Sequence, residues 1–213
     1  MDGLPYRVHP VLSYVEILVK PFAGRWPDTP YMGAVLALFE RIGATLPAAL
    51  PKPVQAILVG GAAVHVYTHS RVSHDVEAIF SHRIILPQDL LVRYTDEAGM
   101  PRQVAYDYNY FADIALMHPD YAQDAIPWGP LATGPLTLAV LGPVDLAVSK
   151  LARFQDQDRR DIAALAEPGL LTANSLRLRV EEALDYYVGD TRWIRHHLAD
   201  ALALIQSSAK APR

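Results

Sequence analysis

The segment between Val54 and Glu77 constrains the fold more than any other part of the sequence. An apolar run, Val54–Val59, meets Gly60-Gly61 and is followed by a helical pattern at Ala62–His69. A short apolar run that ends at glycines predicts a buried strand that turns tightly into a helix. Backbone N–H groups at the start of such a helix can bind a phosphate, because the helix dipole favours anions there. The alternating residues Asp75–Phe80 predict a second strand.

Asp75 and Glu77 occupy alternate positions of that second strand. Side chains alternate between the two faces of a strand, so both carboxylates point to the same side. Two carboxylates placed in this way can hold a divalent cation, and oxygen ligands suit magnesium, which binds substrate phosphates while keeping several waters. Phosphoryl transfer at such sites depends on positioning and charge neutralisation. An exposed edge strand with two ordinary surface acids is the alternative interpretation.

The whole chain predicts an α+β fold: a small mixed sheet flanked by helices, followed by a helical C-terminal part. We expect three parts: an N-terminal helical segment at 1–50, a core at 51–141 and the C-terminal helices at 142–213. Apolar spacing, Gly and Pro positions and capping residues indicate the other elements. They are helices at Leu12–Lys20, Tyr31–Leu46, Pro143–Glu167, from Asn174 or Ser175 to Val188, and from Thr191 to Ser207; strands at Leu90–Tyr94 and Val104–Tyr110 around a turn at Asp96–Gly99; and strands at Asp113–Met117 and Leu136–Val140.

Composition excludes several classes of function. The 213 residues are 51% hydrophobic, which allows a sizeable core, and the net charge of -4 argues against a broad nucleic-acid-binding surface. The absence of cysteine excludes disulfides, zinc-thiolate sites and thiol catalysis. His65 and His69 have helical spacing but no third ligand, so we expect no zinc site. We also expect no signal peptide, no membrane-spanning segment and a cytoplasmic protein.

Two stretches of the constraining segment, Gly60–Ala63 and Ser70–Glu77, resemble the signature of the polymerase-β-like nucleotidyltransferase superfamily. That signature is a hydrophobic residue, Gly-Gly or Gly-Ser, a spacer, and then Asp-x-Asp or Asp-x-Glu. The spacing Arg71-x-Ser73-x-Asp75 is similar to the Arg-x-Thr-x-Asp approach of AbiEii-type toxins and related bacterial nucleotidyltransferase-like proteins. Alone, the glycines and the acidic pair are common features, and their combination in this order is much more specific.

A second block, Pro143–Arg153 with Asp158–Leu165, resembles the helical motif of the same proteins. There an acidic residue, a Lys, an Arg and an Arg-Asp pair precede a hydrophobic residue. On one continuous helix, Lys150 and Asp161 would share a face, because eleven residues make about three turns of ~3.6 residues each. Arg153 would lie one turn from Lys150. A surface helix with stacked ion pairs is the alternative interpretation.

The resemblance implies a site that holds Mg²⁺ or Mn²⁺. Asp75 and Glu77 would be ligands together with a third carboxylate from a neighbouring strand, which would also help to deprotonate an acceptor hydroxyl. Asp107 and Asp113 are the two candidates for that third acid. Asp113 is preferred slightly, because it precedes the purer strand Ile114–Leu116. The implied metal ligands are therefore Asp75, Glu77 and Asp113, with Asp107 as the alternative.

The resemblance also implies residues that bind the nucleotide and support the chemistry. Asp161 would orient a basic residue or act as a base, and Lys150 would assist catalysis through its phosphate contact. The implied nucleotide-binding residues are Gly60, Gly61, Arg71, Ser73, Lys150 and Arg153. Two positions depart from the fullest pattern. Ala62 stands where many active members have Ser, which removes a hydroxyl contact to phosphate, and Glu77 stands where Asp is commoner.

The implied function is metal-dependent transfer of a nucleoside monophosphate from a nucleoside triphosphate to an acceptor hydroxyl. The likeness to AbiEii-type proteins implies the toxin of a toxin–antitoxin pair, with a tRNA end as an acceptor and a cognate antitoxin as a partner. Two alternatives stay open. One is a catalytically inactive nucleotidyltransferase fold that serves as a binding or antitoxin module, which Ala62 and the net charge of -4 favour. The other is a small-molecule nucleotidyltransferase of the antibiotic-modifying kind.

Overall fold

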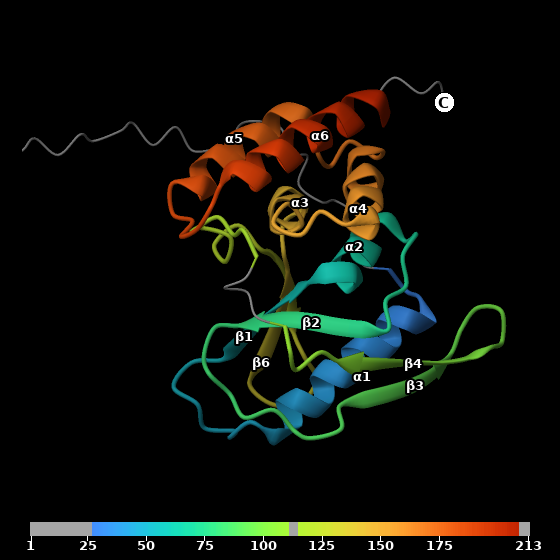
Figure 1. Cartoon of the computed structure of the whole chain (residues 1–213). Coiled ribbons are helices and arrows are strands. Elements are labelled where there is room, and N and C mark those ends of the chain that lie inside the picture. The colour runs from blue at the N-terminus through green and yellow to red at the C-terminus, as the bar shows by residue number, and fades with distance from the viewer. Residues whose placement is uncertain (1–26, 111–114, 209–213) are drawn as a thin grey trace, which may run out of the picture.

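The computed structural model describes residues 27–110 and 115–208, and within them a six-stranded sheet is flanked by helices (Figure 1). The elements are α1 (Pro30–Thr45), β1 (Val54–Val59), α2 (Gly60–Thr68), β2 (Asp75–Phe80), β3 (Leu91–Thr95), β4 (Pro101–Tyr106), β5 (Ile126–Pro130), β6 (Leu136–Val140), α3 (Pro143–Ser149), α4 (Asp156–Ala166), α5 (Ala173–Leu184) and α6 (Arg192–Ser208). The strand order is β3-β4-β2-β1-β6-β5. Pairs β1–β6 and β2–β4 are parallel and the others antiparallel, which confirms the predicted α+β class with a mixed sheet.

Helix α1 covers one face of the outer strands. Its apolar positions recur at helical spacing, and Val35, Leu38, Phe39 and Ile42 are fully buried, as the sequence pattern predicts. The hydroxyl of Thr29 caps the helix by accepting a hydrogen bond from the Met32 amide at 3.2 Å. The helix packs against β3 and β4, so the face of the β3–β4 hairpin away from α1 is left without this cover.

The strands β1 and β2 bring the constraining segment together. β1 lies inside the sheet between β2 and β6 and is buried along most of its length. It ends at Val59, and α2 begins directly at Gly60, two residues earlier than the pattern predicts. Helix α2 packs back onto β1 and β2. The start of α2 therefore lies beside the acidic end of β2.

The single helix predicted over Pro143–Glu167 is wrong, because two helices occupy this segment. α3 ends at Ser149, and Phe154 adopts a left-handed backbone conformation with φ of 50°, which a continuous helix does not allow. The second helix then starts afresh, because the Asp158 carboxylate accepts a hydrogen bond from the backbone amide of Gln155 at 2.9 Å. The chain thus changes direction between the two halves of the second resemblance block.

Further differences from the predictions concern residues 115–117, strand β5 and the cap of α5. Residues 115–117 are not a strand, while the rest of the predicted strand, and the helix at Leu12–Lys20, lie outside the described residues. Strand β5 was not predicted; it contains two prolines and a glycine, which an edge strand with an irregular register tolerates. The cap of α5 is Thr172, whose hydroxyl accepts from the Ser175 amide at 3.0 Å, and not Asn174 or Ser175.

The C-terminal helices form a layer above the acidic end of the sheet, with α5 and α6 furthest from the strands (Figure 1). Helix α3 packs against α2 and α5, and α4 packs against α2 and α6. Arg179 fixes α5 to the start of α3 through two hydrogen bonds of 2.8 Å to Asp145. This contact holds α5 against the start of α3. In the described part of the chain no helix has both the length and the apolar character needed to span a bilayer.

Candidate active site

Gly60 lies where the end of β1 meets the acidic strand. Val59 pairs with Glu77 across β1 and β2, so the next residue, Gly60, faces the Glu77 side chain. A methyl group added at Gly60 would lie 1.6 Å from Oε2 of Glu77, and the backbone φ of Gly60 is +60°. Only glycine fits both the conformation and the close approach. Gly60 therefore allows the Glu77 carboxylate to lie against the start of α2.

Gly61 has a corresponding relation to the loop before β2. A methyl group at Gly61 would lie 2.8 Å from Cβ of Ser73 and 2.9 Å from Nε and Cζ of Arg71. The two side chains thus pass across the first turn of α2. The N-cap residue of α2, Val59, provides no side-chain hydrogen bond to this turn within the described residues. The first amides of α2 and the Arg71 guanidinium together make a setting that favours an anion.

The register between β2 and β4 decides which carboxylate lies next to Glu77 in the sheet. These strands are parallel, with Asp75 opposite Ala105 and Val76 opposite Tyr106, and the Asp107 amide donates to the Val76 carbonyl at 2.9 Å. In the same register Glu77 lies beside Asp107 on one face of the sheet. The structure thus brings Asp107 to Glu77. The other candidate, Asp113, lies outside the described residues.

Glu77 occupies the centre of a strongly charged environment. Burial raises the pKa of its carboxyl above the ordinary value, and the negative charge of Asp107 raises it further. The positive charges of Lys150, Arg153 and Arg71 act in the opposite direction. Each of these groups must therefore lie within electrostatic reach of Glu77. Glu77 is therefore influenced by one acid and three cations that come from separate parts of the sequence.

Asp75 is directed differently from Glu77. Its side chain is 65% exposed, and Oδ1 lies 3.0 Å from Nδ1 of the neighbouring His74. No three His, Asp or Glu side chains among the described residues are grouped closely enough to hold a metal ion. The oxygen-only donors Asp75, Glu77 and Asp107 share one face of two adjacent strands, and their chemistry suits a hard cation such as Mg²⁺. The donor types therefore fit a magnesium ion, although the three side chains are not grouped around one point in the described residues.

Lys150 and Asp161 are in contact, although they lie on different segments and not on one helix. The Lys150 ammonium lies 2.6 Å from Oδ2 of Asp161, and the same carboxylate binds the Arg71 guanidinium. Gln157 donates to the other oxygen of Asp161 at 2.8 Å. The Lys150 and Asp161 side chains are almost fully buried. Asp161 therefore binds both cations with one carboxylate.

Asp158 holds the third cation. It accepts two hydrogen bonds from Arg153 at 2.9 and 2.8 Å, and Lys150 lies 3.7 Å away. Burial acts to raise the pKa of Asp158, but the Arg153 and Gln155 hydrogen bonds and nearby positive charge outweigh it, so the pKa is lowered. The Arg153 side chain is 61% exposed, in contrast to that of Lys150. Arg153 therefore presents a preset guanidinium at the surface of the site.

Three supporting residues were missed or misread at the level of sequence. His65 was considered only for its spacing to His69, but its Nδ1 donates to the Arg71 carbonyl at 2.6 Å and its Nε2 contacts the Thr29 hydroxyl at 3.1 Å. Tyr31 accepts a hydrogen bond from the Ser73 amide at 3.3 Å, and burial raises its pKa to about 12. The third is Asp158. The Asp-Arg-Arg-Asp run at 158–161 is the one sequence signal for the role of Asp158. No sequence signal indicates the contacts of His65 and Tyr31, because these contacts join elements that are separate in the chain.

A mixed sheet with an acid pair beside a glycine turn, faced by basic residues from following helices, defines a nucleotidyltransferase-like protein. The chain belongs to the family described as nucleotidyltransferase of unknown function (DUF6036), whose model matches residues 34–201. The match begins within α1 and ends within α6, and it includes every strand and the helices α2, α3, α4 and α5. No curated protein matches the chain.

Proposed function

We propose that the protein transfers a nucleoside monophosphate from a nucleoside triphosphate to an acceptor hydroxyl in a metal-dependent reaction. The observation that carries the proposal is the position of the Glu77 carboxylate against Gly60, with Asp107 beside Glu77 in the strand register and Arg71 across the next residue, Gly61. An acidic pair suits a cation that binds phosphates, and the surrounding basic groups suit the phosphates themselves. The two sets of charge are complementary to a metal-bound triphosphate.

The residues have separable roles in this proposal. Asp75, Glu77 and Asp107 would hold Mg²⁺ or Mn²⁺, which supplies charge neutralisation on the phosphates when bound. Amides at the start of α2 would bind triphosphate oxygens. Asp107 would accept the proton of the acceptor hydroxyl, whose oxygen forms a bond to the α-phosphorus while the bond to the pyrophosphate leaving group breaks.

Three cations would bind the phosphates with different freedom. Lys150 and Arg71 are fixed by the buried Asp161, and Arg153 is fixed by Asp158 but open to solvent. Cations oriented in advance stabilise developing charge without further reorganisation, which is the main source of catalysis in phosphoryl transfer. Pyrophosphate carries the negative charge of the leaving group. In this proposal Arg71, Lys150 and Arg153 therefore bind the phosphates that leave as pyrophosphate.

The resemblance of the two sequence blocks to AbiEii-type proteins supports a more specific proposal. The protein would act as the toxin of a toxin–antitoxin pair, modifying a tRNA end, with a cognate antitoxin as its partner. The family description names a nucleotidyltransferase and does not name the acceptor. The identity of the acceptor and that of the partner therefore have to be tested separately from the transfer reaction.

Two observations favour a second candidate function, a catalytically inactive nucleotidyltransferase fold that binds a partner or a nucleotide. Ala62 lacks the hydroxyl that many active members place after the glycines, and Asp75 is bonded to His74 and not grouped with two other acids among the described residues. A protein of this kind would bind nucleoside triphosphate without turning it over.

The test is incubation with each α-labelled nucleoside triphosphate, Mg²⁺ and either bulk tRNA or aminoglycosides. Label on tRNA supports the toxin proposal, and label on aminoglycosides supports the small-molecule alternative. Asp75→Ala should abolish transfer, whereas Asp185→Ala, at an exposed residue of the α5 C-cap, should leave it unchanged. Nucleotide binding without any transfer would favour the inactive fold. Absence of both transfer and magnesium-dependent binding would refute the enzyme proposals.

A further inference from the structure

The face of the β3–β4 hairpin that points away from α1 continues the face that carries the acids. Ala105 of β4 pairs with Asp75 on one side and with Leu91 on the other, and Gln103 pairs with Arg93. Residues opposite each other, and residues two positions apart, share one face of a sheet. Arg93 and Gln103 therefore lie on the same face as Asp75, further out along the hairpin.

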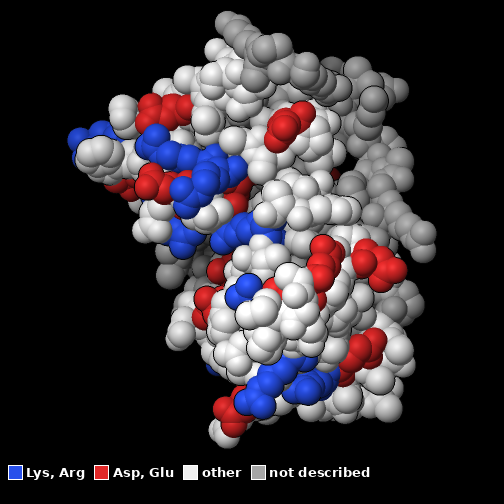
Figure 2. All heavy atoms as spheres, turned by 90° about the vertical axis from the view of Figure 1, so that its right-hand side faces the viewer, with Lys and Arg blue, Asp and Glu red and all other residues white. Residues whose placement is uncertain are grey.

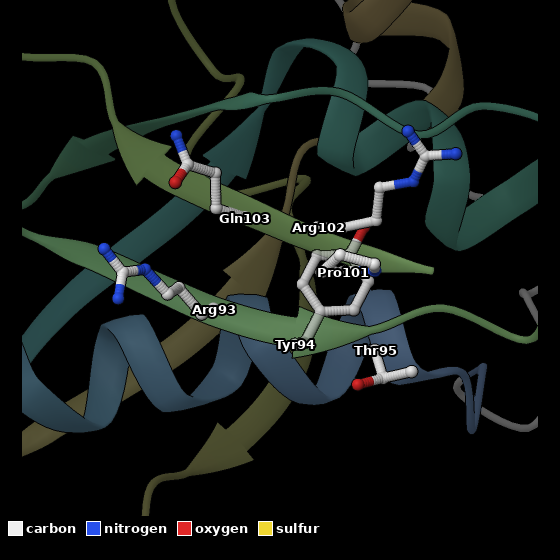
Figure 3. Close-up of a pocket in the computed structure, with 6 residues that line it drawn as sticks. All are labelled: Arg93, Tyr94, Thr95, Pro101, Arg102 and Gln103. Carbon is white, nitrogen blue, oxygen red and sulfur yellow. The ribbon is translucent and has the colours of Figure 1, made fainter. Parts of the chain in front are cut away.

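An open pocket of about 440 Å³ lies at this part of the hairpin (Figure 3). It is lined by Arg93, Tyr94, Thr95, Pro101, Arg102 and Gln103. Figure 3 shows Arg93 and Gln103 projecting from neighbouring positions of the two strands, while Arg102 lies nearer the turn. Arg93 and Gln103 lie on the face away from α1, whereas Tyr94 and Arg102 alternate to the other face, where the Tyr94 ring lies 6.3 Å from that of Tyr31 on α1.

The two arginines differ in what already neutralises them. Arg102 is 58% exposed and donates to Asp96 at 2.9 Å, so part of its charge is compensated. The Arg93 side chain is exposed and makes no hydrogen bond or ion pair with any other residue in 27–110 or 115–208. An exposed, unpaired guanidinium is available for an anion from outside the protein.

A chain of polar contacts links the pocket to the acids. The Gln103 side-chain nitrogen lies 3.1 Å from Nε2 of His74, and Nδ1 of His74 lies 3.0 Å from Asp75. Neighbouring strands are ~4.8 Å apart, so Arg93 on β3 lies roughly 10 Å across the sheet from β2. A ligand with its reactive group at the acids would therefore need an anionic group further along its length to reach Arg93.

We propose that this hairpin face binds the phosphodiester backbone of a single-stranded nucleic-acid acceptor, with its terminal hydroxyl at the acids and a preceding phosphate on Arg93. The proposal rests on the proposed function and assigns the acceptor a site separate from the triphosphate. Arg71 crosses the first turn of α2 and shares Asp161 with Lys150, so cations for the triphosphate are present without the hairpin. Grooves for single strands use cations that follow the backbone, and Arg93 supplies an exposed one on this face.

The basic side chains on this side of the molecule form small separate groups, which suits contact with a short stretch of nucleic acid and not with a long one. Figure 2, which views the right-hand side of Figure 1, shows basic side chains spread from the upper left of the face to its centre, and a separate group at the lower end. Acidic side chains lie between and beside them. With a net charge of -4, binding depends on such local groups, so loss of one unpaired cation should be measurable.

The test measures binding of a short fluorescein-labelled single-stranded RNA, and of the matching DNA, by anisotropy over a range of salt concentrations. Arg93→Ala should weaken binding about fivefold and reduce the slope of log affinity against log salt by about 0.7, the value for one phosphate contact on a single strand. The matched control is Arg83→Ala, since Arg83 is also exposed and without a partner among the described residues, but follows the opposite end of β2. It should leave both quantities unchanged.

Nucleoside triphosphate binding by each variant separates this proposal from the proposed function. The proposal is supported if Arg93→Ala loses affinity for RNA or DNA and keeps its affinity for the triphosphate. It is overturned if Arg93→Ala binds both strands like the wild type, or if Arg83→Ala loses as much. Transfer to a small molecule with no binding of either strand would overturn this site alone. Specific strand binding through Arg93 without any transfer would refute the proposed function alone.

Discussion

Replacement of Gly60 by alanine should remove activity out of proportion to its effect on stability. The added methyl group would lie 1.6 Å from Oε2 of Glu77, whereas ordinary contact begins at 3.4 Å. The carboxylate, as the end of a flexible side chain, would therefore move by about 1.8 Å. Because catalytic groups displaced by ~1 Å can reduce rates about 100-fold, we expect kcat to fall at least that far.

The stability of the same variant should change only modestly. Gly60 has a φ of +60°, and an alanine in the left-handed region costs roughly 1–2 kcal/mol. For a chain of this length that corresponds to a fall in Tm of roughly 2–8 °C. The Glu77 side chain can rotate away, so the clash itself adds less to the free energy of unfolding than to the loss of activity.

Gly169→Ala is the matched control for the backbone. Gly169 has a φ of +80°, and an added methyl group would meet no atom within 4 Å. This variant should show a similar fall in Tm by calorimetry and wild-type transfer of labelled nucleotide. Equal activity losses in the two variants, or wild-type activity in Gly60→Ala, would refute the reasoning that Gly60 is needed to admit Glu77.

Three further predictions concern the charged cluster. Asp161→Ala should lower the free energy of unfolding by about 3–5 kcal/mol in urea titrations, because the buried Lys150 and the Arg71 side chain, which is 22% exposed, lose their shared partner. A loss below ~1 kcal/mol would contradict this role of Asp161. Arg153→Ala should raise the KM for nucleoside triphosphate more than it lowers stability, since its guanidinium is at the surface; an unchanged KM would contradict a phosphate contact. The pKa of Asp158 is lowered below the ~3.9 of an unfolded chain, so the unfolded state binds the proton more readily and stability should fall as the pH drops below about 4. In thermal scans from pH 6 to pH 3, Asp158→Asn should show a weaker pH dependence than the wild type, and an identical dependence would contradict the assignment.

Much of the sheet could be predicted because its signals are local. The run Val54–Val59 is apolar and ends at glycines, and the alternation in Asp75–Phe80 already sets Asp75 and Glu77 on one side. The break after α3 could not be predicted in the same way. Apolar residues keep a helical period on both sides of it, and the turn depends on the left-handed Phe154 and on contacts of Asp158 that form only in the folded chain.

For the site, too, features encoded by neighbouring residues could be predicted, whereas contacts between distant residues could not. The glycines, the acids and the basic residues could each be found from spacing and resemblance. The position of Asp107 beside Glu77 could not, because β2 and β4 are separated in the chain by β3 and pair in parallel. The second role of Gly60, which is to leave room for a carboxylate, also follows only from the three-dimensional contact.

The most direct test of the central claim, that Glu77 and Asp107 act together at the nucleotide site, is Mn²⁺ binding by electron paramagnetic resonance with a non-hydrolysable nucleoside triphosphate. We expect the wild type and Asp185→Asn to bind the ion with equal affinity. Glu77→Gln and Asp107→Asn should each bind at least tenfold more weakly. Wild-type affinity in Asp107→Asn, together with a loss in Asp113→Asn, would contradict the assignment of Asp107. Unchanged affinity in both Glu77→Gln and Asp107→Asn would contradict the site itself.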